Sequence, residues 1–454
     1  MELSRYVVSV KDHPEKGVTL LFNVFNGKAI TLPNNHFAEI EKMREDTPLW
    51  LKTKNSLAGF VKNNFLVKSK DIEEKETIKK LDAMTVGKKK LSVSLLTTTD
   101  CNMYCLYCHE GLRKKKLYLT SQIAENVANF IMRDMADQTT NELLMYFYGG
   151  EPLLNTKAIE SVIRKLENHP IISSGKIRFT KDMSTNGTLL THNMARYLSR
   201  LGINTLQVTL DGPPAVHDRR RGLSGRKGSF WKIIENIKNS MDILQITIRI
   251  NLDKDNQDCM KEMIEILDAE GLCFRLNIYV DFVTNTFENQ RHCRENVMLT
   301  SDEKKKLVEI WWLFDKYQIG IPGLRFTEGM CGNLGRSSLT IDPHGDIYSC
   351  IGFVGQKQYS IANITNFHNI KNNYKKNICN PYLQCIKCKY VPVCGGGCRV
   401  QSVLESGNIL GKSCNKDFLD YAYPEFLKIK FKKQHDSTAG KNGKGNRCTS
   451  SLNR

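Results

Sequence analysis

The stretch LSVSLLTTTDCNMYCLYC, residues 91–108, joins a short apolar run to three closely spaced cysteines. Residues 91–97 have the length and composition of a buried strand. Cys101, Cys105 and Cys108 follow at CX3CX2C spacing, so they occupy the loop directly after that strand. The sequence therefore predicts a cluster of thiols at the carboxyl end of a strand.

Further strand-like runs follow, with apolar residues at helical spacing between them. The runs occupy residues 143–148, 177–183, 206–210, 246–251 and 274–281. Strands and helices that alternate in this way predict a parallel sheet, either open and doubly wound or barrel-like. Catalytic residues of such sheets lie at the carboxyl ends of the strands.

Turn motifs stand at the ends of the next strands. Gly149, Gly150 and Glu151 follow the second run, Ser184 begins Ser-Thr-Asn-Gly-Thr after the third, and Thr209 precedes Asp-Gly-Pro after the fourth. Asn-Gly and Asp-Gly-Pro are also ordinary turn sequences in any protein. Their positions at successive strand ends favour a ligand site over simple turns.

Three thiolates on one loop can hold three irons of a cubane cluster and leave the fourth iron open. The loop, with Tyr107 before its last cysteine, resembles that of the radical S-adenosylmethionine (SAM) superfamily, and Gly149 to Pro152 resembles its GGEP motif. The resemblance implies a [4Fe-4S] cluster on Cys101, Cys105 and Cys108. It also implies SAM-binding roles for Tyr107, Gly149, Gly150, Glu151, Ser184, Thr209 and Arg249.

Alternatives remain for parts of this region. A structural zinc site with His109 as fourth ligand would also suit the CX3CX2C loop. His217, Asp218 and Arg221 continue a run similar to the DGP-x-x-x-HD-x-x-R stretch of peptide- and sulfatase-modifying members. His217 could equally be a packed core residue, and surface ion pairs are the alternative for Arg221 and Arg249.

A second group of cysteines lies toward the C-terminus: Cys331, Cys350, the run Cys385-x2-Cys388-x5-Cys394-x3-Cys398, and Cys414. This pattern resembles a SPASM domain, which in relatives binds two auxiliary [4Fe-4S] clusters. The resemblance places one cluster on Cys385, Cys388, Cys394 and Cys414, and the other on Cys331, Cys350 and Cys398. The fourth ligand of the latter could be Cys379, solvent or a substrate thiolate. Two zinc sites are the alternative, because four thiolates also satisfy zinc. The remaining thiols, Cys259, Cys273, Cys293 and Cys448, are expected to be buried or incidental.

The first part of the chain reads as a small separate unit. Residues 6–10, 18–24 and 29–32 have strand patterns, Asn26-Gly27 is a hairpin turn, and helical patterns precede a short strand at 65–67. This order is similar to the leader-recognition domains of peptide-modifying enzymes, which add a precursor's strand to an exposed sheet edge. A packed extension without such a role is the alternative.

The expected fold class is α/β, in three domains and a tail. A partial (β/α)6 TIM-like radical SAM barrel, residues 89–320, lies between an N-terminal α+β recognition-like domain, 1–88, and a cysteine-rich SPASM domain, 321–425. Residues 426–454 carry eight Lys or Arg against one Asp, a net charge of +7, and read as a basic disordered tail.

The resemblance implies an enzyme that reductively cleaves SAM to a 5'-deoxyadenosyl radical and modifies a ribosomally made peptide. Oxidative crosslinking such as thioether formation is expected, with an external electron donor such as flavodoxin or ferredoxin. Anaerobic sulfatase maturation, which makes formylglycine, is the alternative; those enzymes commonly have an aspartate where Ile351 follows Cys350. A non-catalytic zinc-binding scaffold or precursor-binding protein is a further alternative.

Composition indicates the class of protein and the cellular compartment to expect. The chain has 454 residues, of which 41% are hydrophobic and 25% charged, as in a soluble globular protein. It has no signal-peptide pattern and no apolar run near the ~20 residues that span a bilayer, so a cytoplasmic protein without a membrane partner is expected. Fifteen cysteines in that reducing compartment favour metal ligands over disulfides. The basic residues lack interleaved aromatics, so nucleic acid is not an expected partner.

Overall fold

The computed structural model describes the chain in segments. The described residues are 1–43, 51, 54–86, 90–109, 115–136, 140–223, 225, 227–287, 296–298, 300–321, 338–366 and 381–432. The predicted cluster ligand Cys331, the candidate fourth ligand Cys379, and the thiols Cys293 and Cys448 lie outside the described residues.

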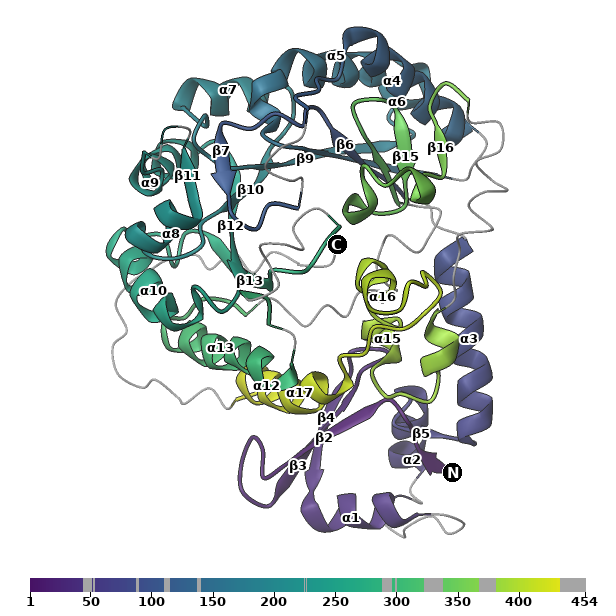
Figure 1. The fold of residues 1–454 in the computed structure, drawn as a ribbon. Helices are drawn as coiled ribbons and strands as arrows, with labels where there is room; N and C mark the ends of the chain where they lie inside the picture. Colours follow the sequence, from purple (N-terminus) through teal and green to yellow (C-terminus); the bar gives the residue numbers. More distant parts are fainter. Residues whose placement is uncertain are drawn as a thin grey trace.

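A mixed sheet with the strand order β13-β12-β10-β9-β8-β6-β14-β15-β16 forms the centre of the molecule (Figure 1). The strands from β6 to β13 run parallel to one another. They are β6 (Lys90–Leu96), β8 (Glu142–Tyr148), β9 (Arg178–Thr185), β10 (Thr205–Thr209), β12 (Gln245–Leu252) and β13 (Asn277–Phe282). The predicted α/β class with a largely parallel sheet is confirmed.

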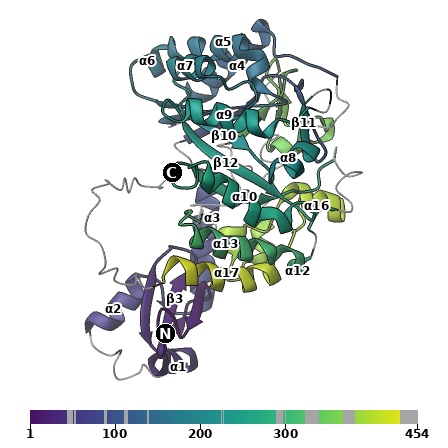
Figure 2. The ribbon, with the colours of Figure 1, turned by 90° about the vertical axis from the view of Figure 1, so that its left-hand side faces the viewer.

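The helices that connect or follow these strands lie along the outer side of the curved sheet (Figures 1 and 2). The longer ones are α4 (Ser121–Ala136), α5 (Thr156–Glu167), α7 (His192–Arg200), α9 (Phe230–Ser240), α10 (Met260–Ala269) and α13 (Lys306–Lys316). Shorter helical turns are η2 (Pro152–Asn155), α6 (Pro170–Ser173), α8 (Pro214–Arg220), η3 (Gln257–Cys259) and α12 (Ser301–Lys304). Within the part of the chain that the structure describes, no helix has the length and apolarity needed to cross a membrane.

Side chains alternate between the two faces of the parallel strands. On β6, Leu91, Val93 and Leu95 are buried in the main core, whereas Ser92 and Ser94 on the opposite face are only partly buried. The other strands repeat this alternation, since successive residues of a strand point to opposite faces. The apolar face packs under the helices, and the polar face is left to line a cavity.

The region predicted as a SPASM domain begins as an extension of the same sheet. β14 (Ser338–Ile341) pairs in parallel with β6, and β15 (Asp346–Tyr348) and β16 (Ala362–Asn363) continue the sheet in antiparallel fashion. The cysteine-rich segment then folds through η5 (Ile351–Phe353), η6 (Lys357–Tyr359), η7 (Pro381–Cys385), α15 (Val391–Cys394) and α16 (Arg399–Ser406).

The N-terminal unit has an antiparallel sheet of β2 (Val7–Lys11), β3 (Val18–Asn23) and β4 (Ala29–Pro33). Its remaining elements are β1 (Glu2–Leu3), α1 (Asn34–Lys42), α2 (Lys54–Lys62), β5 (Leu66–Val67) and α3 (Lys70–Val86). Leu21 on one face joins a small core with Phe37 and Ile40 of α1, while Phe22 on the other face belongs to the main core. The unit is therefore packed on both faces.

A long final helix, α17 (Lys416–Lys430), covers the second face of that sheet. Phe22 contacts Tyr423 at a ring-centroid distance of 6.2 Å, and Phe426 and Leu427 are buried. The predicted start of the disordered tail at residue 426 is therefore wrong. The apolar residues of the helix continue at helical spacing past that point, which keeps them in the core; residues 433–454 lie outside the described part.

The N-terminal unit also contacts the cysteine-rich segment. Tyr382 of η7 hydrogen bonds through its hydroxyl to Asp82 of α3, and the Tyr6 hydroxyl donates to the Ile386 carbonyl oxygen over 3.4 Å. Tyr6 and Tyr382 share a small buried core with Leu81. The N-terminal unit and the cysteine-rich segment, which are about 300 residues apart in the chain, thus form one packed interface.

Replacement of Phe22 by Ala should lower the free energy of unfolding by about 3–5 kcal/mol, because it leaves a cavity between the N-terminal sheet and α17. Phe274→Ala is the matched control, since Phe274 is 77% exposed and its removal should change stability by about 0.5 kcal/mol or less. Denaturant unfolding of both variants checks this; equal losses would contradict the packing described.

Candidate functional site

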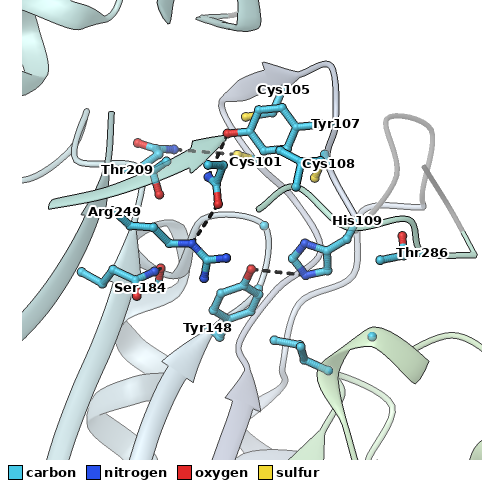
Figure 3. A pocket seen from close by; sticks show the side chains of 18 of the residues that line it. Cys101, Cys105, Tyr107, Cys108, His109, Tyr148, Ser184, Thr209, Arg249 and Thr286 are labelled. Atoms are coloured by element: carbon cyan, nitrogen blue, oxygen red, sulfur yellow. Dashed lines mark hydrogen bonds between the residues drawn. The ribbon is translucent and has the colours of Figure 1, made fainter. Parts of the chain in front are cut away.

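A cavity of about 540 Å³ lies at the carboxyl ends of the parallel strands, a volume in the usual range of about 300–1,000 Å³ for ligand pockets (Figure 3). The polar faces of β6, β8, β9, β10 and β12 contribute to its walls. The predicted residues that line it are Cys101, Cys105, Tyr107, Cys108, Gly149, Gly150, Ser184, Thr209, Arg249, Cys350 and Cys398.

The CX3CX2C loop is held by a two-stranded ribbon. β7 (Met103–Cys105) pairs antiparallel with β11 (Arg221–Leu223), and Cys105 lies opposite Arg221. The Leu106 amide donates to the Arg220 carbonyl oxygen over 3.0 Å. The segment that contains the HD-x-x-R pattern therefore positions the cysteine loop through its backbone.

The thiols of this loop are in a buried setting. Burial, and next the neighbouring Cys105, raise the pKa of the Cys101 thiol to about 12. Burial also raises the pKa of Cys105, while the nearby Arg221 guanidinium opposes that rise. Thiolates are favoured here only beside a positive partner, and iron bound to the sulfurs would supply one.

Among the described residues, no three His, Cys, Asp or Glu side chains converge closely enough to hold a single metal ion. A cubane cluster does not require that convergence, because each thiolate binds a different iron. Three thiols from one loop that face one cavity are a donor set suited to such a cluster.

Gly149 and Gly150 lie against the backbone of the cysteine loop. A Cβ on Gly149 would be 2.3 Å from the Thr98 carbonyl oxygen, and one on Gly150 would be 2.1 Å from the Asp100 carbonyl oxygen. The amides of Gly150 and Glu151 donate to these two oxygens, each over 2.8 Å. The glycines are thus needed for contact with the loop, and an ammonium group here, which can only donate, would bond to backbone carbonyl oxygens.

Glu151 does not line the cavity through its side chain. It is fully buried, and its carboxylate accepts hydrogen bonds from the Asn186 amide at 2.7 Å, the Thr185 hydroxyl at 2.8 Å and the Leu153 amide at 3.0 Å. Burial raises its pKa. The side chain therefore ties the turn after β8 to the turn after β9.

Ser184, Thr209 and Arg249 all face the cavity (Figure 3). The Ser184 hydroxyl accepts from the Gln207 amide nitrogen over 3.2 Å. The Arg249 Nε donates to Asn251 Oδ1 at 2.8 Å, and its terminal nitrogen lies 3.3 Å from the Asp281 carboxylate. Arg249 therefore lines the cavity and also forms a partly exposed ion pair with Asp281, the kind of contact that was its alternative.

Tyr107 contributes its ring to the cavity, and its hydroxyl is engaged in a buried network. That hydroxyl hydrogen bonds to Asp211 and accepts from Arg221 over 2.6 Å and from the Asn251 side chain over 3.1 Å. Asp211 also accepts from the Asn251 amide at 2.8 Å. The network joins the cysteine loop to the ends of β10 and β12.

The four thiols predicted for one auxiliary cluster interact with one another. Burial raises the pKa of Cys394, and the adjacent Cys385, Cys388 and Cys414 raise it further. A Cβ on Gly397 would be 1.8 Å from the Ser413 carbonyl oxygen, so the glycine allows the two parts of this cysteine-rich segment to approach.

Arg399 stabilises the same cysteine-rich segment through hydrogen bonds to its backbone. Its guanidinium donates to the carbonyl oxygens of Gly396, Gly397, Ile409 and Gly411 at 2.5–3.1 Å. Cys398, directly before it, lines the cavity together with Cys350. The two described members of the second predicted ligand set therefore share one cavity with the first cysteine loop.

Tyr148, Gln207 and Asn251 were not predicted as site residues from the sequence, and His109 was named there only as the fourth ligand of the alternative zinc site. His109 and Tyr148 lie 3.2 Å apart between ring nitrogen and hydroxyl, and both line the cavity with Gln207 and Asn251 (Figure 3). The alternation of strand side chains was the available signal, because it places polar residues at the carboxyl ends on the inner face. His217, by contrast, is a buried core residue, with its ring nitrogens 3.2 Å from the Asp211 amide and 3.1 Å from the Ser229 hydroxyl.

Burial, and then Arg221, lower the pKa of His217 to about 4 from 6.5. As the pH falls, the His217 imidazole is protonated in the unfolded chain before it is protonated in the folded protein. The contribution of the neutral imidazole to folding stability is therefore complete above about pH 6.5 and is lost as the pH falls toward 4. The loss should approach about 3 kcal/mol. His217→Asn should have a shallower pH dependence of unfolding free energy over this range; equal slopes would contradict the burial of a neutral imidazole.

Comparison with known proteins identifies a matching family model and several relatives of this chain. Residues 95–267 match the family model described as Radical SAM superfamily. The cysteine-type anaerobic sulfatase-maturating enzyme of Clostridium perfringens is 21% identical, covering 73% of this chain and 96% of that protein. The mycofactocin maturase MftC of Mycolicibacterium smegmatis is 25% identical over 66% of this chain and 76% of its own.

Solved structures agree on the fold. Native anSMEcpe with bound AdoMet and Cp18Cys peptide superposes with a TM-score of 0.58 at 18% identity, over 75% of this chain and 97% of that one. Streptococcus suis SuiB bound to precursor peptide SuiA gives a TM-score of 0.53 at 14% identity, over 91% and 99%. The chain therefore carries a radical SAM domain, and its relatives include sulfatase-maturating enzymes and peptide maturases.

Proposed function

We propose that this chain is a radical SAM maturase that modifies a ribosomally made peptide by oxidative crosslinking, such as thioether formation. One observation carries the proposal: Cys101, Cys105 and Cys108 face the same cavity as Cys350 and Cys398. A substrate in that cavity would lie between two groups of thiols. Such an arrangement suits a reaction that first removes a hydrogen atom and then an electron.

The residues present fit the cofactors that this function needs. Cys101, Cys105 and Cys108 would hold a [4Fe-4S] cluster, and Ser184, Thr209 and Arg249 would orient SAM in the adjoining cavity. When bound, the reduced cluster and SAM would supply a 5'-deoxyadenosyl radical able to remove a hydrogen atom from the peptide. Carbonyl oxygens at Gly149 and Gly150 would accept from the amino group of SAM, and Arg249 would attract its carboxylate.

The cysteine-rich segment would hold two auxiliary [4Fe-4S] clusters. Cys385, Cys388, Cys394 and Cys414 would complete one of them. Cys331, Cys350 and Cys398 would hold the second, close to the substrate. These clusters would accept the second electron, and an external donor such as flavodoxin or ferredoxin would supply the electron for SAM cleavage.

The N-terminal unit would recognise the precursor through the free edge of β4. The Asn23 amide donates to the Lys28 carbonyl oxygen, and the Asn34 amide donates to the Gly17 carbonyl oxygen. In this antiparallel register, every second residue from Lys28 to Asn34 therefore bonds to β3. Ala29 and Thr31 therefore direct their backbone groups to the outer edge. No described strand pairs with that edge, which suits addition of a peptide strand.

Sulfatase maturation is a second candidate, favoured by the likeness that covers 96% of the Clostridium perfringens enzyme. The SuiB structure, which was solved with a precursor peptide, matches 91% of this chain against 75% for anSMEcpe. The wider match to a structure with a bound precursor peptide supports a precursor peptide as the proposed substrate.

The function is tested by anaerobic reconstitution with iron and sulfide, followed by SAM, a reductant and a candidate precursor peptide. Release of 5'-deoxyadenosine with loss of two hydrogen atoms from the peptide is the expected result by mass spectrometry. Iron-loaded protein that releases no 5'-deoxyadenosine would exclude the radical reaction. Colourless protein with stoichiometric zinc would instead support a scaffold.

Replacement of Cys105 by Ala should abolish SAM cleavage, because it removes a proposed ligand of the first cluster. Cys394→Ala should leave some cleavage and stop peptide modification, since it affects only an auxiliary site. Cys273→Ala is the matched control, because Cys273 is buried in the main core and lies outside the cavity. Equal loss of cleavage in Cys105→Ala and Cys394→Ala would contradict this division of roles.

Thr31→Pro should weaken precursor binding at least tenfold, because it removes an outward amide of β4 without breaking a bond to β3. Thr31→Val keeps the amide and should bind the precursor as the parent protein does. Fluorescence anisotropy with a labelled precursor measures both. If the Pro and Val variants bind equally well, the β4 edge is not the recognition site.

A further inference from the structure

Arg221 occupies an unusual position for a cation. It follows α8, begins β11 and pairs through its backbone with Cys105 in the cysteine loop. The residue is only 7% exposed, yet it is among the residues that line the cavity with Cys101, Cys105 and Cys108. A buried charge in this place requires a compensating partner.

The partners of Arg221 within the described residues do not satisfy all of its donors. One terminal nitrogen donates to the Tyr107 hydroxyl over 2.6 Å and lies 3.6 Å from the Asp211 carboxylate. Its Nε is buried and has no hydrogen-bond partner among the described residues. Asp211 is shared with Asn251 and Tyr107, so it offsets the charge of Arg221 only in part.

The adjacent Arg220 provides the contrast. Its terminal nitrogens reach both oxygens of Asp253 at 2.6 and 2.8 Å, so its charge is neutralised by a bidentate pair. Its Nε is also unpartnered among the described residues, but Arg220 does not line the cavity. Of these two neighbouring buried arginines, Arg221 is the one that a ligand on the cysteine loop would meet.

We propose that Arg221 is a positioning residue for the cluster that the proposed function places on Cys101, Cys105 and Cys108. Its buried charge offsets the negative charge that the cluster gains on reduction, and its Nε hydrogen is held for a sulfur acceptor. Net charge and hydrogen bonds to sulfur set the reduction potential of such clusters. Charge acts strongly here because the surroundings are buried. Arg221 therefore makes the cluster easier to reduce, and Asp211 opposes it.

The test is a redox titration of the whole reconstituted protein, followed by electron paramagnetic resonance. The signal of this cluster is assigned as the one that Cys105→Ala loses. Arg221→Gln should lower the equilibrium constant for reduction at least tenfold, which is a potential about 59 mV more negative for a one-electron couple. Asp211→Asn should shift the potential in the opposite direction.

Arg219→Gln is the matched control, because Arg219 is an exposed arginine of α8, two residues before Arg221, and its replacement should leave the potential unchanged. Arg221→Lys retains the charge and should retain most of the potential. Arg221→Gln with full iron content and the parent potential would overturn the proposal. Arg221→Gln could also fail to take up iron. In that case, the proposal is supported if Arg221→Lys takes up iron and its cluster has a potential close to the parent value. If neither variant takes up iron, Arg221 has a structural role only and the proposal is overturned.

The proposed function fails in a different way. In that case the parent protein itself would take up no iron and would give no cluster signal. A parent cluster that is present but insensitive to both Arg221 and Asp211 would leave the function intact and overturn only the role of Arg221.

Discussion

The common edge at which the parallel strands end is the constraint on which the site depends. Because β6, β8, β9, β10 and β12 run in one direction, their following turns meet on one side of the sheet. The turn after β8 bonds through its amides to the loop after β6, and Glu151 ties it to the turn after β9. The cysteine loop thus takes its shape from neighbouring turns as well as from bonds within its own sequence, such as that from the Asp100 amide to the Thr98 hydroxyl.

Below this edge, buried polar groups fix the site. Tyr107, Asp211, Arg221 and Asn251 form one hydrogen-bonded network, in which Tyr107 is partly buried and the other three are buried. In such surroundings a satisfied network is rigid, whereas loss of one member leaves the others with unmet donors or acceptors. The position of the cysteine loop and the position of the Arg221 and Asp211 charges beside it therefore depend on the same hydrogen bonds.

The three parts of the chain are joined by shared cores. Phe22 of the N-terminal sheet packs on α17, and Tyr6 and Tyr382 connect that unit to the cysteine-rich segment. β14 continues the central sheet from β6. A peptide held at the β4 edge would therefore bind to a unit that is packed against the segment containing the proposed auxiliary sites.

The sequence by itself determined the strands, the helices between them and the motifs at their ends. Period-two alternation and apolar helical spacing are local signals, so the parallel sheet could be predicted, as could the positions of the cysteine loop, Ser184 and Thr209 at strand ends and of Arg249 on a strand. The same local signals failed at residue 426, where α17 continues because its apolar side chains meet the N-terminal sheet.

Only the tertiary structure decided which distant groups meet. The pairing of Cys105 with Arg221, the shared cavity of Cys108 and Cys350, and the turn of the Glu151 side chain away from that cavity depend on contacts between residues far apart in the chain. Spacing along the sequence contains no information on such distances. They follow from the packing of the sheet, which brings its strand ends and the cysteine-rich segment around one cavity.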